Sequence, residues 1–413
     1  MFHPGPFPRS KTTLALSTLL HAFTHAYATM LVPLYLLMVQ DLNLKGVQAV
    51  SLIVTVYGLV YCLASYGAGV LADRVDRKVL LGTGLIGNAI AITLMGLTRR
   101  YDMLIALGVL AGLFGTLFHP SANALVTAHF PKAPGMAIGL LGCGAGLGFF
   151  AGPQFAGWRA ESARWQWMDV ANWQRPCVEL GIAGLVVGLL FLLLAREVPR
   201  KHADDAPHPP LDPTMRKRVI ALAAVLGCRD FAGVASLSLV GIYLLRAHEL
   251  DAKRTGFIVG AMMLVSVIVN PLFVYFSGGR RRLPTLSTML VLGGVVVATL
   301  PFWPLAGVLP VMCLFQTFQL GSYAVSDAAT LERVPADVRG RVVGLFLLFA
   351  GTFASTGPWV MGAWTDALGE RAHDAIAYLP LFGTLGAMMI VAAFSTPLIA
   401  KLGAADENAI DPM

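Results

Sequence analysis

Residues 69–78 form a short charged turn between two long apolar runs, with the sequence Gly69-Val70-Leu71-Ala72-Asp73-Arg74-Val75-Asp76-Arg77-Lys78. The runs cover about 47–72 and 79–98, and each is long enough for a helix that crosses the roughly 30 Å hydrocarbon layer of a bilayer. Gly69 lets two helices approach closely, Asp73 can accept hydrogen bonds from a neighbouring helix N-terminus, and the basic side chains favour a cytosolic turn.

The whole chain repeats this pattern. Of its 413 residues, 56% are hydrophobic and 13% are charged, whereas soluble domains carry about 25% charged residues. The apolar runs are continuous, which favours helices over the alternating strands of a membrane barrel. We therefore predict an all-α polytopic membrane protein with twelve transmembrane helices, near 14–40, 47–72, 79–98, 103–130, 135–157, 178–195, 218–245, 255–277, 284–303, 306–331, 341–364 and 376–400.

The distribution of positive charge predicts the orientation. If both termini are cytoplasmic, the cytoplasmic connections carry 19 Lys and Arg residues and the outer connections carry 10, as the positive-inside rule requires. The net charge of +7 has the same explanation, because its basic residues sit at helix ends and form no run interleaved with aromatic residues. Nucleic acid is therefore not an expected partner.

An internal repeat of 205 residues divides the chain. Five positions in the first half recur in the second with the same residue type: Gly135, Gly139, Gly152, Pro153 and Gly157 become Gly340, Gly344, Gly357, Pro358 and Gly362. We predict two six-helix bundles, residues 1–198 and 218–413, joined by a cytoplasmic linker at 199–217. An even number of helices in each half gives parallel repeats, with substrate bound between them near mid-bilayer.

The Gly69–Lys78 stretch resembles the G-x-L-A-D-R-x-G-R-K signature of the major facilitator superfamily, with Asp76 where the signature has glycine. The resemblance extends over nearly the whole chain. It implies a secondary transporter that works by alternating access, and it implies that Gly69, Asp73, Arg74, Arg77 and Lys78 form a conformational motif. It also implies that helices one, four, seven and ten line the central cavity.

Two further stretches bear on the branch of the family. Gly144, Gly148 and Gly152 lie on one face of the fifth helix and precede Pro153, similar to the Gly-Pro motif of drug and proton antiporters. Helix packing explains the same spacing, and the equivalent Gly357-Pro358 pair favours a structural role in both halves. The fourth helix lacks the arginine usual in those antiporters; its segment Phe118–Val126 instead looks like the fosmidomycin-resistance branch.

Ionisable side chains at membrane depth are the candidate site residues, because each costs about 2.5 to 3.5 kcal/mol without a partner or a wet cavity. All six lie in the four helices that the resemblance assigns to the cavity: His21, His25, His119, Arg229, Asp230 and Asp327. The polar side chains Asn123, Gln319 and Tyr323 lie in the same helices. We expect these nine residues to bind substrate or to couple transport to protons, with Asp230 or Asp327 carrying the proton.

Three structural alternatives stay open at this stage. Arg229 and Asp230 can simply lock helices together, and His119 can be a packed histidine beside the Pro120 kink. The spacing of His21 and His25 also serves zinc, but zinc prefers four ligands that commonly include Cys or carboxylate, and none lies nearby in sequence. The sequence therefore predicts no metal and no cofactor.

The function that the sequence favours is proton-coupled efflux of an anionic or amphipathic small molecule. The alternative is a proton-coupled importer of an organic acid or sugar. We expect a monomer in the inner membrane of a bacterium, with a small-molecule substrate, protons and the lipid bilayer as its partners. No enzymatic activity is expected.

Overall fold

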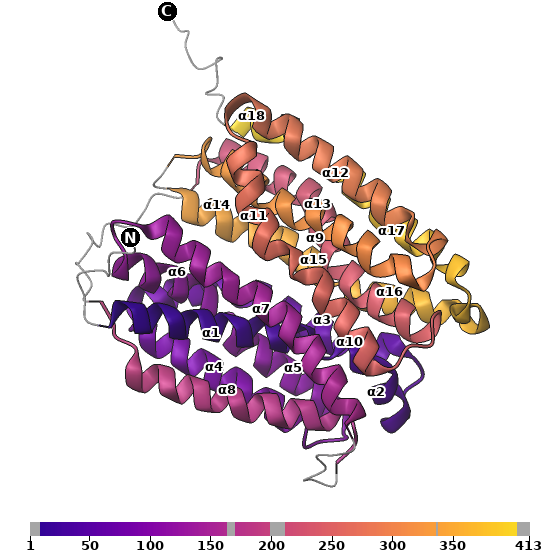
Figure 1. Ribbon diagram of the computed structural model, residues 1–413. Helices are drawn as coiled ribbons and strands as arrows, with labels where there is room; N and C mark the ends of the chain where they lie inside the picture. Colours follow the sequence, from indigo (N-terminus) through magenta and orange to yellow (C-terminus); the bar gives the residue numbers. More distant parts are fainter. Residues whose placement is uncertain (1–8, 163–169, 199–210, 336–337, 403–413) are drawn as a thin grey trace, which may run out of the picture.

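The computed structural model describes residues 9–162, 170–198, 211–335 and 338–402, and every regular element in them is a helix (Figure 1). The first group of α-helices is α1 (Ser10–Thr29), α2 (Tyr35–Asp41), α3 (Val47–Arg74), α4 (Arg77–Met95), α5 (Tyr101–Gly115), α6 (Phe118–His129), α7 (Pro134–Glu161) and α8 (Gln174–Leu194). The second is α9 (Pro213–Arg246), α10 (Ala252–Met263), α11 (Val265–Phe276), α12 (Arg282–Ala298), α13 (Leu305–Leu331), α14 (Arg339–Phe346), α15 (Thr352–Ser355), α16 (Gly357–Ala367), α17 (Leu379–Ala392) and α18 (Ser395–Leu402).

Eleven helical stretches in the described residues are long and apolar enough to cross a membrane. They correspond to eleven of the twelve predicted spans. The remaining span, 255–277, is interrupted at Leu264, so that α10 and α11 have 12 residues each. The all-helical prediction is confirmed, and a count of twelve requires α10 and α11 to cross together.

Several predicted spans contain breaks. The first span changes to a short 3-10 helix at Val32–Leu34, where Pro33 lacks the N–H that a continuous helix needs. The eleventh contains a π-helical segment at Leu347–Gly351, and α16 then starts afresh with Pro358 in its first turn. Such irregularities depend on local hydrogen bonding, which hydropathy does not report.

The linker predicted at 199–217 lies largely outside the described residues. Its last part is helical, because α9 begins at Pro213, five residues before the predicted span. The Asp212 carboxylate caps this helix by accepting hydrogen bonds from the backbone N–H groups of Thr214 and Met215, at 2.9 and 3.1 Å. Asp before a Pro at the first helical position is a strong start signal.

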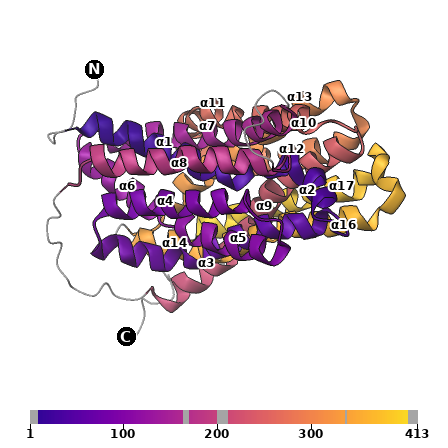
Figure 2. The same ribbon diagram turned by 90° about the horizontal axis from the view of Figure 1, so that it is seen from below.

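The helices pack as two sets that lie side by side. In the first set, α1 packs on α7 and α4 packs on α5 and α8; in the second, α12 packs on α13 and α17, and α9 packs on α17. Figure 1 shows the indigo-to-magenta set beside the rose-to-yellow set, and in Figure 2, seen from below, the first set lies in front of part of the second. The sets meet where α10 contacts α7 and where α16 contacts α3.

The two ends of this assembly differ. We call the end that carries the turn between α3 and α4 the motif end, and the other the distal end. At the distal end a Cβ atom on Gly256 of α10 would overlap the carbonyl oxygen of Pro153 in α7. At the motif end, Gly139 and Gly344 have no described neighbouring atom within 4 Å of such a Cβ. The two sets are therefore closely packed at the distal end and apart at the motif end.

Candidate functional site

A cavity of about 460 Å³ lies between the two sets of helices. The first set contributes residues of α1, α3, α6 and α7, and the second contributes residues of α9, α10, α13 and the start of α16. Its wall includes His25, Tyr57, Tyr61, Cys62, His119, Phe149, Leu237, Met263, Gln316, Gln319, Tyr323 and Pro358. The wall is mainly apolar and aromatic with a few polar groups, as is usual for small-molecule sites.

Three histidines meet at the α1 and α6 side of this cavity. Helix spacing puts His21 and His25 on one face of α1, and His119 in the first turn of α6 reaches the same point. The nearest ring nitrogens of His21 and His25 are 3.0 Å apart, and the ring centroids of His21 and His119 are 5.1 Å apart. The sequence predicted all three as site residues, and the structure brings them together.

Arg229 does not face the cavity. Its side chain is fully buried, and its guanidinium donates hydrogen bonds to the carboxylate of Asp230 at 2.8 Å and to the hydroxyl of Ser326 at 2.7 Å. The same guanidinium lies 3.8 Å from the centroid of the Tyr323 ring. All these partners belong to α9 and α13, so Arg229 locks two helices of one set together. This is the structural alternative that the sequence left open.

Tyr323 and Gln319 of α13 do reach the cavity wall. The side chain of Gln319 donates a hydrogen bond of 3.3 Å to the Tyr323 hydroxyl. That hydroxyl also interacts with the carboxylate of Asp230. Asp230 therefore contacts the cavity wall through Tyr323, although it is not itself part of the wall.

Two predicted site residues lie apart from the cavity. Asp327 and Asn123 are both exposed, and neither contributes to its wall. Asp327 follows Tyr323 by one helical turn toward the motif end and interacts electrostatically with Arg229. Asp327 is therefore a neighbour of the Arg229 guanidinium and not a part of the cavity wall.

The sequence missed three aromatic residues that make up much of the wall, Tyr57, Tyr61 and Phe149. Tyr57 and Tyr61 are four residues apart in α3, so they share one helix face. Two tyrosines at that spacing, in a mainly apolar helix, were the available signal.

The family model of the Major Facilitator Superfamily matches residues 14–358. The chain belongs to this superfamily. Members of this superfamily are integral membrane proteins that carry small molecules across membranes.

Two curated members of the superfamily illustrate the similarity. The Multidrug resistance protein MdtG of Dickeya zeae (strain Ech586) is 34% identical over 145 residues, which are 34% of this chain and 35% of that protein. The Tetracenomycin C resistance and export protein of Streptomyces glaucescens is 33% identical over 158 residues, 38% of this chain and 28% of that protein. The matched segments thus span about a third of these relatives.

A solved structure shares the superfamily fold over nearly the full chain. It is a bacterial homologue of the human lysosomal transporter Spinster, in an inward-facing and occupied conformation. The TM-score is 0.78 with 18% sequence identity, and the match covers 96% of this chain and 97% of the other. At that identity the likeness shows the fold alone.

The superfamily signature stretch lies at the open motif end. Arg74 is exposed, Gly69 has no described neighbour within 4 Å of a Cβ, and the side chain of Asp73 is outside the described part of the structure. The backbone N–H of Lys78, in the first turn of α4, donates a hydrogen bond of 2.7 Å to the carboxylate of Glu197. The close helix approach expected at Gly69 is absent here, because the two sets are apart at this end.

The Gly-Pro stretch of α7 lies in a packed interface. A Cβ atom on Gly148 would overlap the carbonyl oxygen of Ala22 in α1, and one on Gly152 would lie 2.5 Å from that of Ala26. Pro153 follows where α7 meets α10. In the second set, Gly357 of the equivalent pair packs against Ala235 of α9, and Pro358 reaches the cavity wall.

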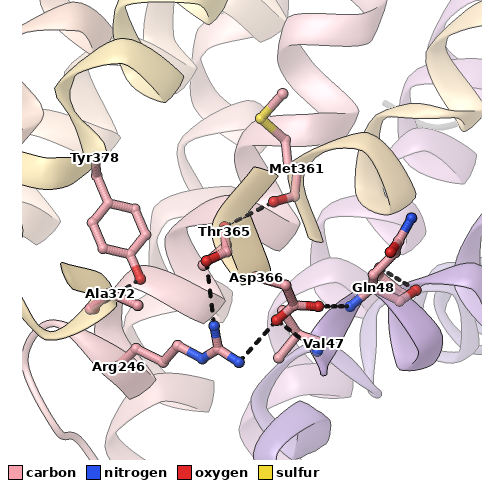
Figure 3. Close-up of polar contacts among 9 residues, drawn as sticks. Val47, Gln48, Arg246, Met361, Thr365, Asp366, Ala372 and Tyr378 are labelled. Carbon is pink, nitrogen blue, oxygen red and sulfur yellow. Dashed lines mark hydrogen bonds and ion pairs between the residues drawn. The ribbon is translucent and has the colours of Figure 1, made fainter. Parts of the chain in front are cut away.

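A carboxylate closes the distal end of this superfamily transporter (Figure 3). Asp366 of α16 accepts hydrogen bonds from the backbone N–H groups of Val47 and Gln48, at 3.1 and 2.8 Å, and thereby caps α3. It also forms an ion pair of 3.0 Å with Arg246 of α9. Since α3 belongs to the first set and α9 to the second, Asp366 joins the two sets.

Proposed function

We propose that the chain is a proton-coupled exporter of small amphipathic organic compounds. It works as a monomer by alternating access in the inner membrane of a bacterium, with both chain ends in the cytoplasm. Residues 1–198 and 218–413 act as two six-helix halves joined by a linker at 199–217. The observation that carries the proposal is the cavity between the two sets of helices, with one end packed and the other open.

The cavity wall supports an amphipathic cargo. Tyr57, Tyr61 and Phe149 offer ring faces, while His25 and Gln319 offer a small number of hydrogen bonds. The case for an anionic cargo is weaker, because Arg229 is satisfied by Asp230 and is sealed from the cavity. A sugar, the cargo of the importer alternative, would require more polar groups than this wall provides.

The direction of transport is inferred from the relatives. MdtG is named as a multidrug resistance protein, and the Streptomyces protein as a resistance and export protein. Export requires that cargo enter from the cytoplasm or the inner leaflet. With the motif end facing the cytoplasm, the described conformation is inward-facing, which agrees with the conformation named for the similar Spinster homologue.

Proton coupling is assigned to the carboxylates of the second half. Asp230 interacts with the cavity wall through Tyr323, and Asp327 borders the open space one turn away. Protonation of Asp230 would weaken its pairing with Arg229 and free the Tyr323 hydroxyl for cargo. This links proton occupancy to the shape of the wall.

Transport in proteoliposomes tests the proposal. An imposed proton gradient should drive accumulation of an amphipathic dye in inverted vesicles, and cells that overproduce the protein should tolerate toxic amphipathic compounds. Asp230→Asn and Asp327→Asn should reduce gradient-driven transport at least tenfold. Asp102→Asn, in an exposed pair with Arg100, is the matched control. Full gradient-driven transport by both variants would exclude these two coupling groups, and sensitisation of cells would favour import.

A further inference from the structure

The three histidines beside the cavity have the geometry of a metal site. His21, His25 and His119 each offer one ring nitrogen, and these nitrogens all lie within 4.8 Å of one another. A zinc ion with Zn–N distances of about 2.0–2.1 Å holds its tetrahedral ligands roughly 3.3 Å apart. Small rotations of two imidazole rings therefore suffice to bring all three nitrogens onto one ion.

The hydrogen bond of His21 fixes which nitrogen is available. Its Nδ1 lies 2.8 Å from the carbonyl oxygen of Leu141, which can only accept, so Nδ1 carries the proton. The Nε2 atom of His21 then carries a lone pair, which accepts a hydrogen bond from Nε2 of His25, 3.0 Å away. A bound ion would take the place of the proton between these two nitrogens, with His25 protonated on Nδ1 instead. Metal-binding histidines usually donate their second ring N–H to a carbonyl or carboxylate in this way.

The surroundings hold the rings and shield the site. The ring of His21 stacks on Phe118 with centroids 4.6 Å apart, and His25 lies 4.2 Å from the ring centroid of Phe149. Because His25 and His119 also belong to the cavity wall, one side of the cluster is open. An ion here would have three protein ligands and a fourth position directed at the cavity.

We propose that His21, His25 and His119 bind one divalent transition-metal ion of the zinc, copper or nickel class. Neutral imidazole suits these ions, whereas calcium and magnesium require oxygen ligands. Water, or a donor atom of a cargo molecule, completes the coordination. The sequence predicted no metal because only His21 and His25 are close along the chain; the third ligand, His119, comes from α6. The proposal is independent of the direction and coupling of transport.

Binding to the purified protein tests the site directly. The full chain, without a histidine tag and stripped of metal in detergent, is titrated with Cu²⁺ and examined by electron paramagnetic resonance, and Zn²⁺ is titrated against a chromophoric zinc indicator. We expect one ion per chain, nitrogen hyperfine structure from three imidazoles, and no competition from Mg²⁺. His21→Gln, His25→Gln and His119→Gln should each weaken binding at least tenfold.

A matched control separates this site from other histidines. His373 is exposed at the distal end and pairs with Glu249, so His373→Gln should leave binding unchanged. The proposal is overturned if the wild-type protein binds no ion, if its spectrum shows fewer than three nitrogen ligands, or if the control loses as much affinity as the cluster variants. Because the wild-type spectrum alone counts the ligands, the test does not depend on the folding of any variant. If the wild-type protein exports its cargo but binds no metal ion, the metal site is overturned and the transport proposal stays intact.

Discussion

At the scale of single residues, the buried pair of Arg229 and Asp230 shows how an ionisable group in a membrane helix can be structural. Removing one partner leaves the other charge buried and unpaired, which costs about 3–5 kcal/mol. We therefore expect Arg229→Met to lower the thermal stability strongly. The double variant Arg229→Met/Asp230→Leu should regain most of it, because an apolar pair of similar volume needs no partner.

Thermal unfolding in detergent, followed by tryptophan fluorescence, measures this difference. Transport is not the readout, because the double variant removes Asp230, the proposed proton carrier. The two variants are compared by stability alone. If the double variant were no more stable than the single one, Arg229 would have a role other than neutralising Asp230.

Glu197 follows α8 at the motif end and should make the stability of the protein depend on pH. Burial and the neighbouring carboxylate of Asp76 raise the pKa of Glu197 to about 7, although the N–H of Lys78 opposes the shift. The folded protein thus holds this proton more tightly than the unfolded chain does. The contribution of Glu197 to the free energy of unfolding is complete below about pH 4.5 and is lost as the pH rises to about 7.

The melting temperature of the wild type should therefore fall by a few degrees between pH 5 and pH 8. Glu197→Gln mimics the protonated carboxyl, so its melting temperature should vary less over the same range. Glu370→Gln, at an exposed position in a distal loop, should retain the wild-type pH dependence. An unchanged slope in Glu197→Gln would show that other groups set the pH dependence.

The site residues were only partly predictable from the sequence. His21 and His25 follow from helix periodicity, but their meeting with His119 depends on how α6 crosses α1. Arg229 was predicted to lie within the seventh span, but its direction within α9 is set by Ser326 and Tyr323, which are almost a hundred positions away. Hydropathy locates a residue along a helix; tertiary packing decides which side of the helix it faces.

At the scale of elements, the sequence predicts the helices well and their interruptions poorly. Eleven predicted spans correspond to helical stretches that can cross a membrane, because continuous apolar runs of about 20 residues have few other solutions. The break at Leu264 and the π-helical turn at Leu347–Gly351 lie within apolar runs that look uninterrupted. They reflect backbone hydrogen bonding and packing across the interface of the two sets.

The contact of α7 with α1 can be tested with two glycines on α7, one in the contact and one outside it. Gly148 lies against the backbone of Ala22, whereas Gly142 on the same helix has no described atom within 4 Å of a Cβ. Gly148→Ala should destabilise the protein by about 1–3 kcal/mol, the usual cost of overpacking. Gly142→Ala should be neutral or slightly stabilising, since alanine favours helix.

Melting temperatures of the two variants, measured side by side in one detergent, decide the matter. Equal losses would mean that helix propensity or expression, rather than the approach of α7 to α1, governs both positions. The comparison is sharp because the two glycines are six residues apart in one helix and differ in what they face.

In the whole molecule, the two sets of helices can meet at either end, and in the described conformation they meet at the distal end. The distal interface has glycines pressed against backbone, as at Gly256 and Gly362, together with the Asp366 bridge. The motif end has Gly139 and Gly344, related by the 205-residue repeat, without described neighbours. If the protein works by alternating access, as proposed, the second pair would become the close contact when the first opens, and each end would carry glycine for a different state.

Asp366 should control the balance between these states. Its carboxylate caps α3 across the interface and pairs with Arg246 (Figure 3), and losing a capping carboxylate costs about 0.5–2 kcal/mol. These interactions exist only when the distal end is closed, so Asp366→Ala raises the free energy of that state alone. The population should therefore shift by roughly twofold to thirtyfold toward the state in which the motif end is closed.

Electron paramagnetic resonance distances between spin labels measure the shift. Labels at Met136 of α7 and Val343 of α14, both exposed near the motif end, are attached in a chain whose five native cysteines are replaced. The short-distance fraction should grow in Asp366→Ala. It should not grow in Asp102→Ala, which breaks an exposed distal pair within one set. An identical distribution in wild type and Asp366→Ala would mean that the packed glycines alone hold the distal end closed, because the bridge would then contribute nothing to the difference in free energy between the two states.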